Sequence, residues 1–324
     1  MFAKYLKAMV FFEKDTAASI KQWVDWIDPL LDTLINGVTL EERWNYVAPS
    51  LELEELFLID SSKNRGEQLE YLKHILPADT SVITIHLYQT GKMNALLGDV
   101  NLHIERTRCD GQNNMNISDK LCISFTIHER FWEHCAQKAW LHHFKHLSAM
   151  LHACYAFIDL APIAVPCYEQ CPYFAFGGVE KSRYSNFIPA AYWGSMVQES
   201  HFSLRDQYKP LEAYLEQSPC EVVESWTNGQ YKAHWLQMTR DASFNTTYYP
   251  ERMRFRQYFH DCIPKLIPQY IENVTNNAFL NPYMIHLLPV AESEYESFDT
   301  AIKSNRWIRR DRKRYTALAK NPTP

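Results

Sequence analysis

The sequence is poor in glycine and lacks the motifs that bind nucleotides. Only nine of its 324 residues are glycine. Dinucleotide-binding folds need glycine where the backbone approaches phosphates, and neither G-x-G-x-x-G nor G-x-x-x-x-G-K-[ST] occurs in the chain. The G-x-S-x-G elbow of hydrolases is missing too, and no cysteine lies in a protease signature. We therefore expect a protein that is not an enzyme and needs no cofactor.

Long hydrophobic runs are also missing. No window approaches the roughly 18 apolar residues that a membrane-spanning helix requires. The N-terminal residues 1–7 lack the apolar core and the small-residue cleavage site of a signal peptide. The eight cysteines are then expected to be reduced thiols. These features predict a cytoplasmic protein with no membrane contact.

Charge is distributed unevenly along the chain. The net charge is −5, but residues 303–324 carry eight Lys or Arg and one acid. Residues 1–302 therefore hold 25 basic and 37 acidic groups, a net charge of −12. An acidic body attracts basic partners and repels nucleic acid. We expect no direct binding of nucleic acid, and the sequence leaves open whether the basic tail is ordered.

Hydrophobic periodicity predicts a strand–helix–strand unit between residues 121 and 160. Residues 121–127 alternate between apolar and small or polar side chains, which is typical of a half-buried strand. Residues 128–150 place apolar side chains at steps of three and four, which predicts one helix with an apolar stripe. The apolar run 153–158 then reads as a second strand. This order is typical of a βαβ unit with its helix on a sheet.

Similar patterns extend the prediction over the rest of the chain. Strands are expected at residues 5–12, 81–88 and 99–107, helices at 20–34, 67–76 and from 250, and irregular structure at 41–50. Asn228-Gly229 between two alternating segments predicts a hairpin over residues 221–238. The fold class is therefore α/β or, more closely, α+β, with two related halves that each have a mixed or antiparallel sheet and packed helices.

Proline and glycine mark the expected domain boundary. Four prolines and the pair Gly177-Gly178 fall within residues 161–189, which predicts a long aromatic and proline-rich connecting loop. The domains are then an N-terminal α/β half at 1–160, this loop, a C-terminal α/β half at 190–302 and the basic tail at 303–324.

Histidine and cysteine clusters offer an alternative reading as a metal site. His142 and His146 are four residues apart on the expected helix and could share a zinc ion, but the H-E-x-x-H motif is absent. A second group has ligand-like chemistry and consists of His152, Cys154, Cys167 and Cys171. We expect no metal, because the paired histidines lie outside the apolar stripe and Cys154 lies in an apolar strand. An uncharacterised enzyme or zinc-binding protein that uses these groups stays the alternative.

Two acidic runs are the candidate binding residues. They consist of Glu52, Glu54, Glu55 and Asp60, and of Glu292, Glu294, Glu296 and Asp299. Such runs usually form solvated surface. They could also dock a basic partner, because charge complementarity speeds association. Asp159, at the expected end of a strand, is the best single candidate for a polar site residue, but the sequence favours a solvated strand-end carboxylate there.

The order of elements resembles a family of bacterial immunity proteins attached to type VI secretion systems. The matching features are the strand 121–127 running into a helix, the segment 152–158, the aromatic-rich Ala191-Tyr192-Trp193-Gly194, the hairpin 221–238 and the helix after Pro250. The resemblance covers about residues 80–275 and rests on this pattern, with no diagnostic motif.

The resemblance implies a protein that binds and neutralises a cognate effector toxin in the cytosol. Such an effector would attack a cytosolic target, with a nuclease as the candidate class. A nuclease needs a basic surface to hold phosphates, so an acidic inhibitor could mimic its substrate. No interface residue can be transferred from the family, and the sequence also leaves a homodimer open.

Overall fold

The computed structural model divides the chain into two compact units, Met1–Ile163 (unit 1) and Ala164–Pro324 (unit 2). The structure describes residues 5–12, 20–35, 40–48, 50–51, 55–59, 63–89, 100–107, 120–161, 188, 192–203, 210–244, 249–259 and 261–262. Each unit is described below by itself.

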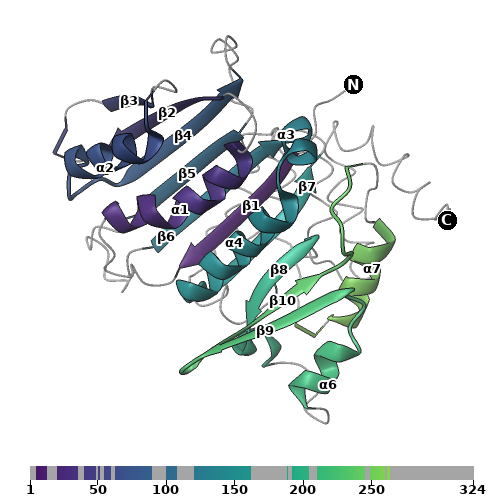
Figure 1. Ribbon diagram of the computed structural model, residues 1–324. Helices are drawn as coiled ribbons and strands as arrows, with labels where there is room; N and C mark the ends of the chain where they lie inside the picture. Colours follow the sequence, from purple (N-terminus) through teal and green to yellow (C-terminus); the bar gives the residue numbers. More distant parts are fainter. Residues whose placement is uncertain are drawn as a thin grey trace, which may run out of the picture. The chain divides into compact units, whose positions relative to one another are not determined.

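The described part of unit 1 contains a seven-stranded sheet in the order β3-β2-β4-β5-β6-β1-β7 (Figure 1). The strands are β1 (Tyr5–Phe12), β2 (Leu40–Val47), β3 (Glu55–Ile59), β4 (Val82–Gln89), β5 (Val100–Thr107), β6 (Lys120–His128) and β7 (Tyr155–Ala161). All six neighbouring pairs are antiparallel. The strands predicted at residues 5–12, 81–88, 99–107 and 121–127 are therefore confirmed.

The predicted strand–helix–strand unit is present, but a third strand separates its two strands. Both β6 and β7 pair antiparallel with β1, so they run parallel to each other on either side of it. The connection consists of α3 (Glu129–His134) and α4 (Gln137–Met150). The prediction of one helix over residues 128–150 is wrong, because α3 ends at His134, Cys135 has an extended backbone, and α4 begins only at Gln137.

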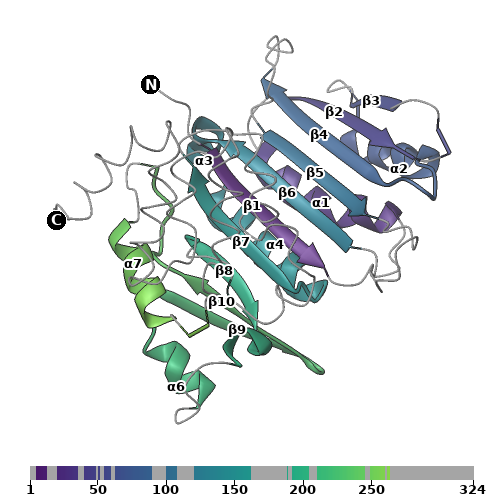
Figure 2. The same ribbon diagram turned by 180° about the vertical axis from the view of Figure 1, so that it is seen from behind.

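Helices cover one face of this sheet. Figure 1 shows α1 (Ile20–Ile35), α2 (Arg65–Ile75) and α4 on the near side of the strands, and Figure 2 shows the sheet from its opposite face. Aromatic rings fill the space beneath α4: Phe125 on β6 lies 5.5 Å from Trp140, and Trp140 stacks on Phe144 at 5.3 Å, measured between ring centroids. Burial of such large apolar side chains is the main force that holds helix and sheet together.

Strand β2 corrects the prediction of irregular structure at residues 41–50. Glu42, Trp44 and Tyr46 all point to the helix-covered face and are buried. A charged residue in the buried position hides the alternation that normally marks a strand. The structure accommodates Glu42 because Trp44 Nε1 and the Arg65 guanidinium both donate to its carboxylate.

Unit 2 has a three-stranded antiparallel sheet in the order β8-β10-β9 in its described part. The strands are β8 (Gly194–Gln198), β9 (Val222–Asn228) and β10 (Tyr231–Gln237), with the 3₁₀ helix η3 (Glu199–Phe202) and the helices α6 (Leu211–Glu216) and α7 (Tyr249–Tyr258). Aromatic side chains from η3, from α6 and from the residue directly after α7 pack together: Phe202 lies 6.1 Å from Phe259 and 6.3 Å from Tyr214. With helices packed on antiparallel strands in both units, the α+β prediction is confirmed.

The predicted hairpin of unit 2 is confirmed, with its turn shifted by one residue. Asn228 pairs with Tyr231, so the two loop residues are Gly229 and Gln230. Gly229 has a φ of 59°. A glycine with positive φ at the first loop position is typical of a type II′ turn, whereas the sequence suggested Asn228 and Gly229 as the loop.

No helix in the described ranges is long and apolar enough to cross a membrane.

Candidate protein-interaction surface

Most of the acidic residues proposed from the sequence lie outside the described ranges. Glu52, Glu54, Asp60, Glu292, Glu294, Glu296 and Asp299 belong to this group. Glu55 is described, and its exposed side chain occupies the first position of β3. The structure thus places one of the eight residues, at the edge of the unit 1 sheet.

The residues of the alternative metal site are spread over different environments. His142 and His146 are exposed on α4, with their rings nearly parallel and 6.3 Å apart. His152 follows the helix in a turn with a φ of 53°, and the buried Cys154 thiol donates to Phe11 O at 3.0 Å. Cys167 and Cys171 lie outside the described ranges. Among the residues that the structure describes, no group of three or more His, Cys, Asp or Glu could hold a metal ion.

Exposed hydrophobic side chains gather at the β3 edge of the sheet. Five large hydrophobic residues of the described part are exposed: Val47 at 38%, Leu56 at 49%, Leu58 at 51%, Tyr71 at 59% and Met150 at 44%. All except Met150 lie on β2, on β3 or on the face of α2 beside them. We name Val47, Leu56, Leu58 and Tyr71, with the backbone of β3, the β3 edge surface.

Strand register explains how these side chains are arranged. Leu56 pairs with Asn45 and Leu58 with Arg43, so both leucines lie on the face opposite the helices, with Val47 diagonally beside Leu56. Successive side chains of a strand point to opposite faces. Phe57 accordingly lies on the helix-covered face, where its ring is 6.0 Å from that of Tyr71. Apolar side chains therefore flank the edge of the sheet on both faces.

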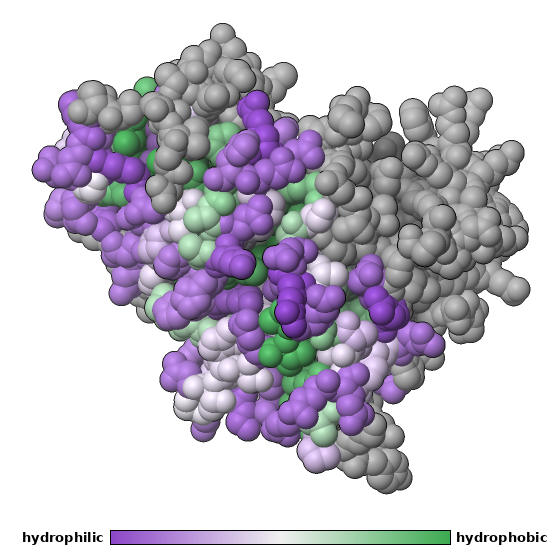
Figure 3. Space-filling model, turned by 45° about the vertical axis from the view of Figure 1, so that its right-hand side comes forward, coloured by the Kyte–Doolittle hydropathy of each residue, from purple (hydrophilic) through white to green (hydrophobic). Residues whose placement is uncertain are grey.

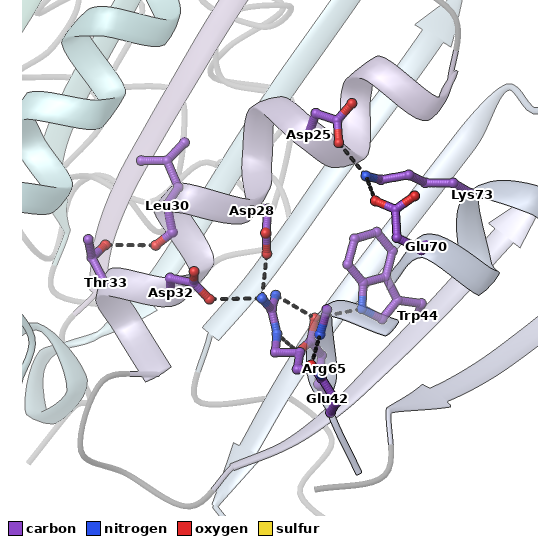
Figure 4. Close-up of polar contacts among 12 residues, drawn as sticks. Asp25, Asp28, Leu30, Asp32, Thr33, Glu42, Trp44, Arg65, Glu70 and Lys73 are labelled. Atoms are coloured by element: carbon purple, nitrogen blue, oxygen red, sulfur yellow. Dashed lines mark hydrogen bonds and ion pairs between the residues drawn. The ribbon is translucent and has the colours of Figure 1, made fainter. Parts of the chain in front are cut away.

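Carboxylates from α1 and α2 lie next to β2, and two basic residues hold them together (Figure 4). Arg65 contacts Asp28, donates to Asp32 Oδ1 at 2.8 Å and donates to Glu42 Oε2 at 2.7 Å. Lys73 contacts Asp25 and donates to Glu70 Oε1 at 2.6 Å. Both cations are thus engaged with carboxylates of the same unit.

The neighbouring charges shift the pKa values of Arg65 and Asp32. Burial lowers the pKa of Arg65, but the hydrogen bonds and charges of Glu42 and Asp28 outweigh it and hold the pKa above its ordinary value. The pKa of Asp32 is raised by partial burial and by the neighbouring charge of Asp28, against the opposing effect of Arg65. Arg65 therefore stays charged at any physiological pH, and it ties α1, β2 and α2 together.

The part of unit 1 that carries the β3 edge surface is acidic. The described residues between 20 and 89 include nine Asp or Glu and five Lys or Arg, a net charge of −4. The side chains of Asp25, Asp32 and Glu70 are more than half exposed. In Figure 3, hydrophilic residues cover most of the coloured surface and hydrophobic ones form small patches among them.

A row of polar side chains crosses the face opposite the helices, from β2 to β7, and its Lys7 and Asp159 end is buried. Cross-strand pairing aligns Arg43, His86, Asn101, Thr126, Lys7 and Asp159 in this order. His86 Nδ1 lies 2.6 Å from Asn101 Oδ1, and Lys7 Nζ donates to Thr126 Oγ1 at 3.0 Å. The row begins at Arg43, opposite Leu58, so it adjoins the β3 edge surface.

The far end of this row corrects the sequence interpretation of Asp159. The sequence favoured a solvated carboxylate at a strand end, but Asp159 lies inside β7 and is only 1% exposed. It pairs across the strands with Lys7, which is 2% exposed. Opposite charges placed directly across an antiparallel pair stabilise each other, and this lowers the free-energy cost of burying both.

These features together describe a surface suited to binding a protein. Exposed apolar patches surrounded by polar residues mark interaction sites in soluble proteins. The sequence reasoning found the acidic run of this region but missed the exposed leucines. A signal that could have found them is the short apolar run Leu56-Phe57-Leu58-Ile59 directly after Glu55.

Comparison with known proteins finds a similar solved structure but no matching sequence. The chain matches no protein-family model, and no curated protein matches its sequence. Among solved structures, it is similar to the T6SS protein PA0821 of Pseudomonas aeruginosa, with a TM-score of 0.54 and 13% sequence identity. The match covers 94% of this chain and 89% of that chain. The two chains therefore share a fold.

Proposed function

We propose that this chain is an immunity-type protein that binds and neutralises a cognate effector of a type VI secretion system. The observation that carries the proposal is the β3 edge surface, where exposed apolar side chains lie in an acidic part of unit 1. The fold shared with a T6SS protein and the order of elements in the sequence support the choice of system.

The charge of unit 1 indicates the kind of effector. An acidic surface around an apolar centre favours a partner with basic residues around its own apolar contact, because complementary potentials speed encounter and exclude partners of like charge. Enzymes that hold nucleic acid have such basic surfaces. A nuclease effector in the cytosol therefore fits the proposal best.

A co-expression experiment tests the function. Each protein encoded beside this chain would be expressed in a sensitive bacterial host, with and without this chain. We expect one neighbouring protein to stop growth and this chain to restore it, with a complex recovered by size-exclusion chromatography. Toxicity from a neighbouring secreted protein that this chain neither relieves nor binds would contradict the proposal.

Charge reversal tests the proposed role of the acidic surface separately. Glu55 and Glu67 are exposed on β3 and α2, and we expect Glu55→Lys with Glu67→Lys to slow association with the effector by about tenfold at low salt. The matched control is Glu133→Lys with Glu216→Lys, which reverses two exposed charges on α3 and α6. Equal slowing by both pairs would mean that only the total charge matters.

A further inference from the structure

The outer edge of β3 is a strand edge that has no partner strand in the described part of the chain. β3 is terminal in the strand order and pairs with β2 on its other side. Along an edge strand of an antiparallel pair, alternate residues direct their N–H and C=O groups away from the sheet. Such groups form a ready template for a further strand.

Three of the devices that protect natural sheet edges are not found in the residues of β3. Natural edge strands are blunted by lysine, by proline or by a bulge. The five residues Glu55–Ile59 include no lysine and no proline, and they pair with β2 in an unbroken register from Tyr46 to Glu42. The edge is therefore regular enough to accept another strand.

Side chains on both faces of β3 provide the apolar contact for such a strand. Leu56 and Leu58 are about half exposed on the face opposite the helices, and Tyr71 is 59% exposed on the helix-covered face. A strand added at about 4.8 Å from β3 would place its alternate side chains against these two sets of residues. In recognition by strand addition, main-chain hydrogen bonds give affinity and contacts to alternate side chains give specificity.

We propose that β3 binds an extended, basic strand of the effector by strand addition, which extends the unit 1 sheet. The identity of the partner rests on the proposed function, whereas the binding mode rests on the β3 edge alone. Charge selects the occupant, because the described residues 20–89 carry a net charge of −4. A second copy of this chain would bring two such acidic regions together at the same edge, so a basic strand is favoured over β3 of another copy.

A peptide experiment on the full chain tests the binding mode without the effector. The probe is a synthetic seven-residue peptide in which lysine alternates with valine or isoleucine. We expect it to slow hydrogen exchange of backbone amides within residues 55–59 and to leave those of β4 and β5 unchanged. A peptide with glutamate in place of lysine, and one with N-methyl groups on alternate amides, are expected to bind at least about tenfold more weakly. Equal binding of either control peptide, or protection confined to another segment, would overturn the proposal.

Substitutions on exposed positions separate the edge from the rest of the surface. Leu56→Lys with Leu58→Lys places two charges on the edge, which we expect to weaken peptide binding at least about tenfold. The matched control is Met150→Lys, since Met150 is a comparably exposed hydrophobic residue on α4. Circular dichroism and the urea midpoint would check that both variants fold. Unchanged peptide binding by the doubly substituted variant would contradict the proposal.

Two further measurements, one with the effector and one on self-association of the chain, test which partner β3 binds. With a neighbouring effector that this chain neutralises, we expect protection of residues 55–59 in the complex, and its absence there overturns strand addition while the immunity function stands. If no neighbouring protein is neutralised but the basic peptide still protects β3, the immunity function fails and the edge-binding mode stands. A dimer that Leu56→Lys dissociates in sedimentation equilibrium would identify a second copy as the occupant and overturn the proposal.

Discussion

Arg65 joins carboxylates that come from two other elements of unit 1. Its guanidinium contacts Asp28 and Asp32 on α1 and Glu42 on β2, and Glu42 is only 4% exposed. A planar group with several fixed N–H donors suits this task better than the ammonium of lysine. Glu42 is buried in an otherwise apolar layer, and the strand keeps its position because Arg65 compensates that charge.

The first prediction concerns this compensation. We expect Arg65→Ala to lower the free energy of unfolding by about 3 kcal/mol, because it leaves the Glu42 carboxylate buried without a counter-charge. Arg254→Ala is the control, since Arg254 is 63% exposed and bonds only Glu251 on its own helix in the described part of the chain. It should change stability by about 0.5 kcal/mol or less. Urea unfolding of both variants checks this, and equal losses would contradict the assigned role of Arg65.

We expect His234 to make the stability of unit 2 depend on pH. Its Nδ1 lies 2.9 Å from Ser225 Oγ, and its Nε2 is buried with no hydrogen-bond partner among the described residues. Burial lowers the pKa of His234 below the ordinary value of 6.5, and the charges of Glu199 and Glu212 offset this only in part. The folded state therefore binds a proton less readily than the unfolded state does.

The second prediction follows from the sign of this shift. The contribution of His234 is fully present above pH 6.5 and decreases as the pH falls through 6.5 toward the lower pKa of the folded state, by at most about 1.4 kcal/mol per pH unit. We expect the urea midpoint of unit 2, followed between pH 7.5 and 5.5, to fall less steeply in His234→Gln than in the native protein. Identical slopes would show that His234 does not titrate in this way.

Individual residues also show where sequence reasoning reaches its limit. The rings of Trp140 and Phe144 could be assigned to the core because helical spacing places them on one stripe. The burial of Lys7 and Asp159 could not be predicted in this way. The free-energy cost of burying each charge is lowered only by the register that places the two residues opposite each other. Register depends on contacts between segments about 150 residues apart, which a single sequence does not encode locally.

At the scale of elements, local patterns identified most strands and helices but not their pairing. The alternation in residues 82–89 and 120–128 is strong because every second side chain is apolar and buried on the helix-covered face, whereas all eight residues of β1 are buried. β2 was missed because Glu42 interrupts that pattern. The position of β1 between β6 and β7 could not be predicted either. A strand–helix–strand pattern indicates that its two strands are parallel, but it does not show whether a third strand lies between them.

The third prediction concerns the contact between β8 and β10. A Cβ atom at Gly194 would lie 2.5 Å from Trp235 Cζ2, and the indole is held by a 2.9 Å hydrogen bond from its Nε1 to Gln237 Oε1. We expect Gly194→Ala to destabilise unit 2 by about 3 kcal/mol, since a fully buried ring must move. Gly229→Ala serves as a comparison, because its Cβ meets nothing within 4 Å and only its φ of 59° is unfavourable, at about 1 kcal/mol. Thermal unfolding of both variants distinguishes packing from backbone strain, and a smaller loss at Gly194 than at Gly229 would contradict this account.

At the scale of the whole molecule, the candidate surface belongs to one unit. The β3 edge surface, the Arg65 cluster and the polar row from Arg43 to Asp159 all lie between Met1 and Ile163. The sequence predicted an acidic body over residues 1–302 but located the binding residues by runs of acids alone. The candidate surface is formed only on folding, because folding brings the edge leucines and the carboxylates of α1 and α2 into one region.

The fourth prediction is that residues 1–163 fold and bind without the rest of the chain. Every pair of neighbouring strands from β3 to β7 lies within this segment, and so do α1 to α4, which cover one face of the sheet. We expect the isolated segment to unfold in a single cooperative transition and to bind the alternating basic peptide within about threefold of the full chain. Circular dichroism with urea titration and hydrogen exchange of residues 55–59 measure the two properties. A folded segment that no longer binds the peptide would mean that unit 2 contributes to the site. A segment without cooperative unfolding would mean that the units depend on each other for stability.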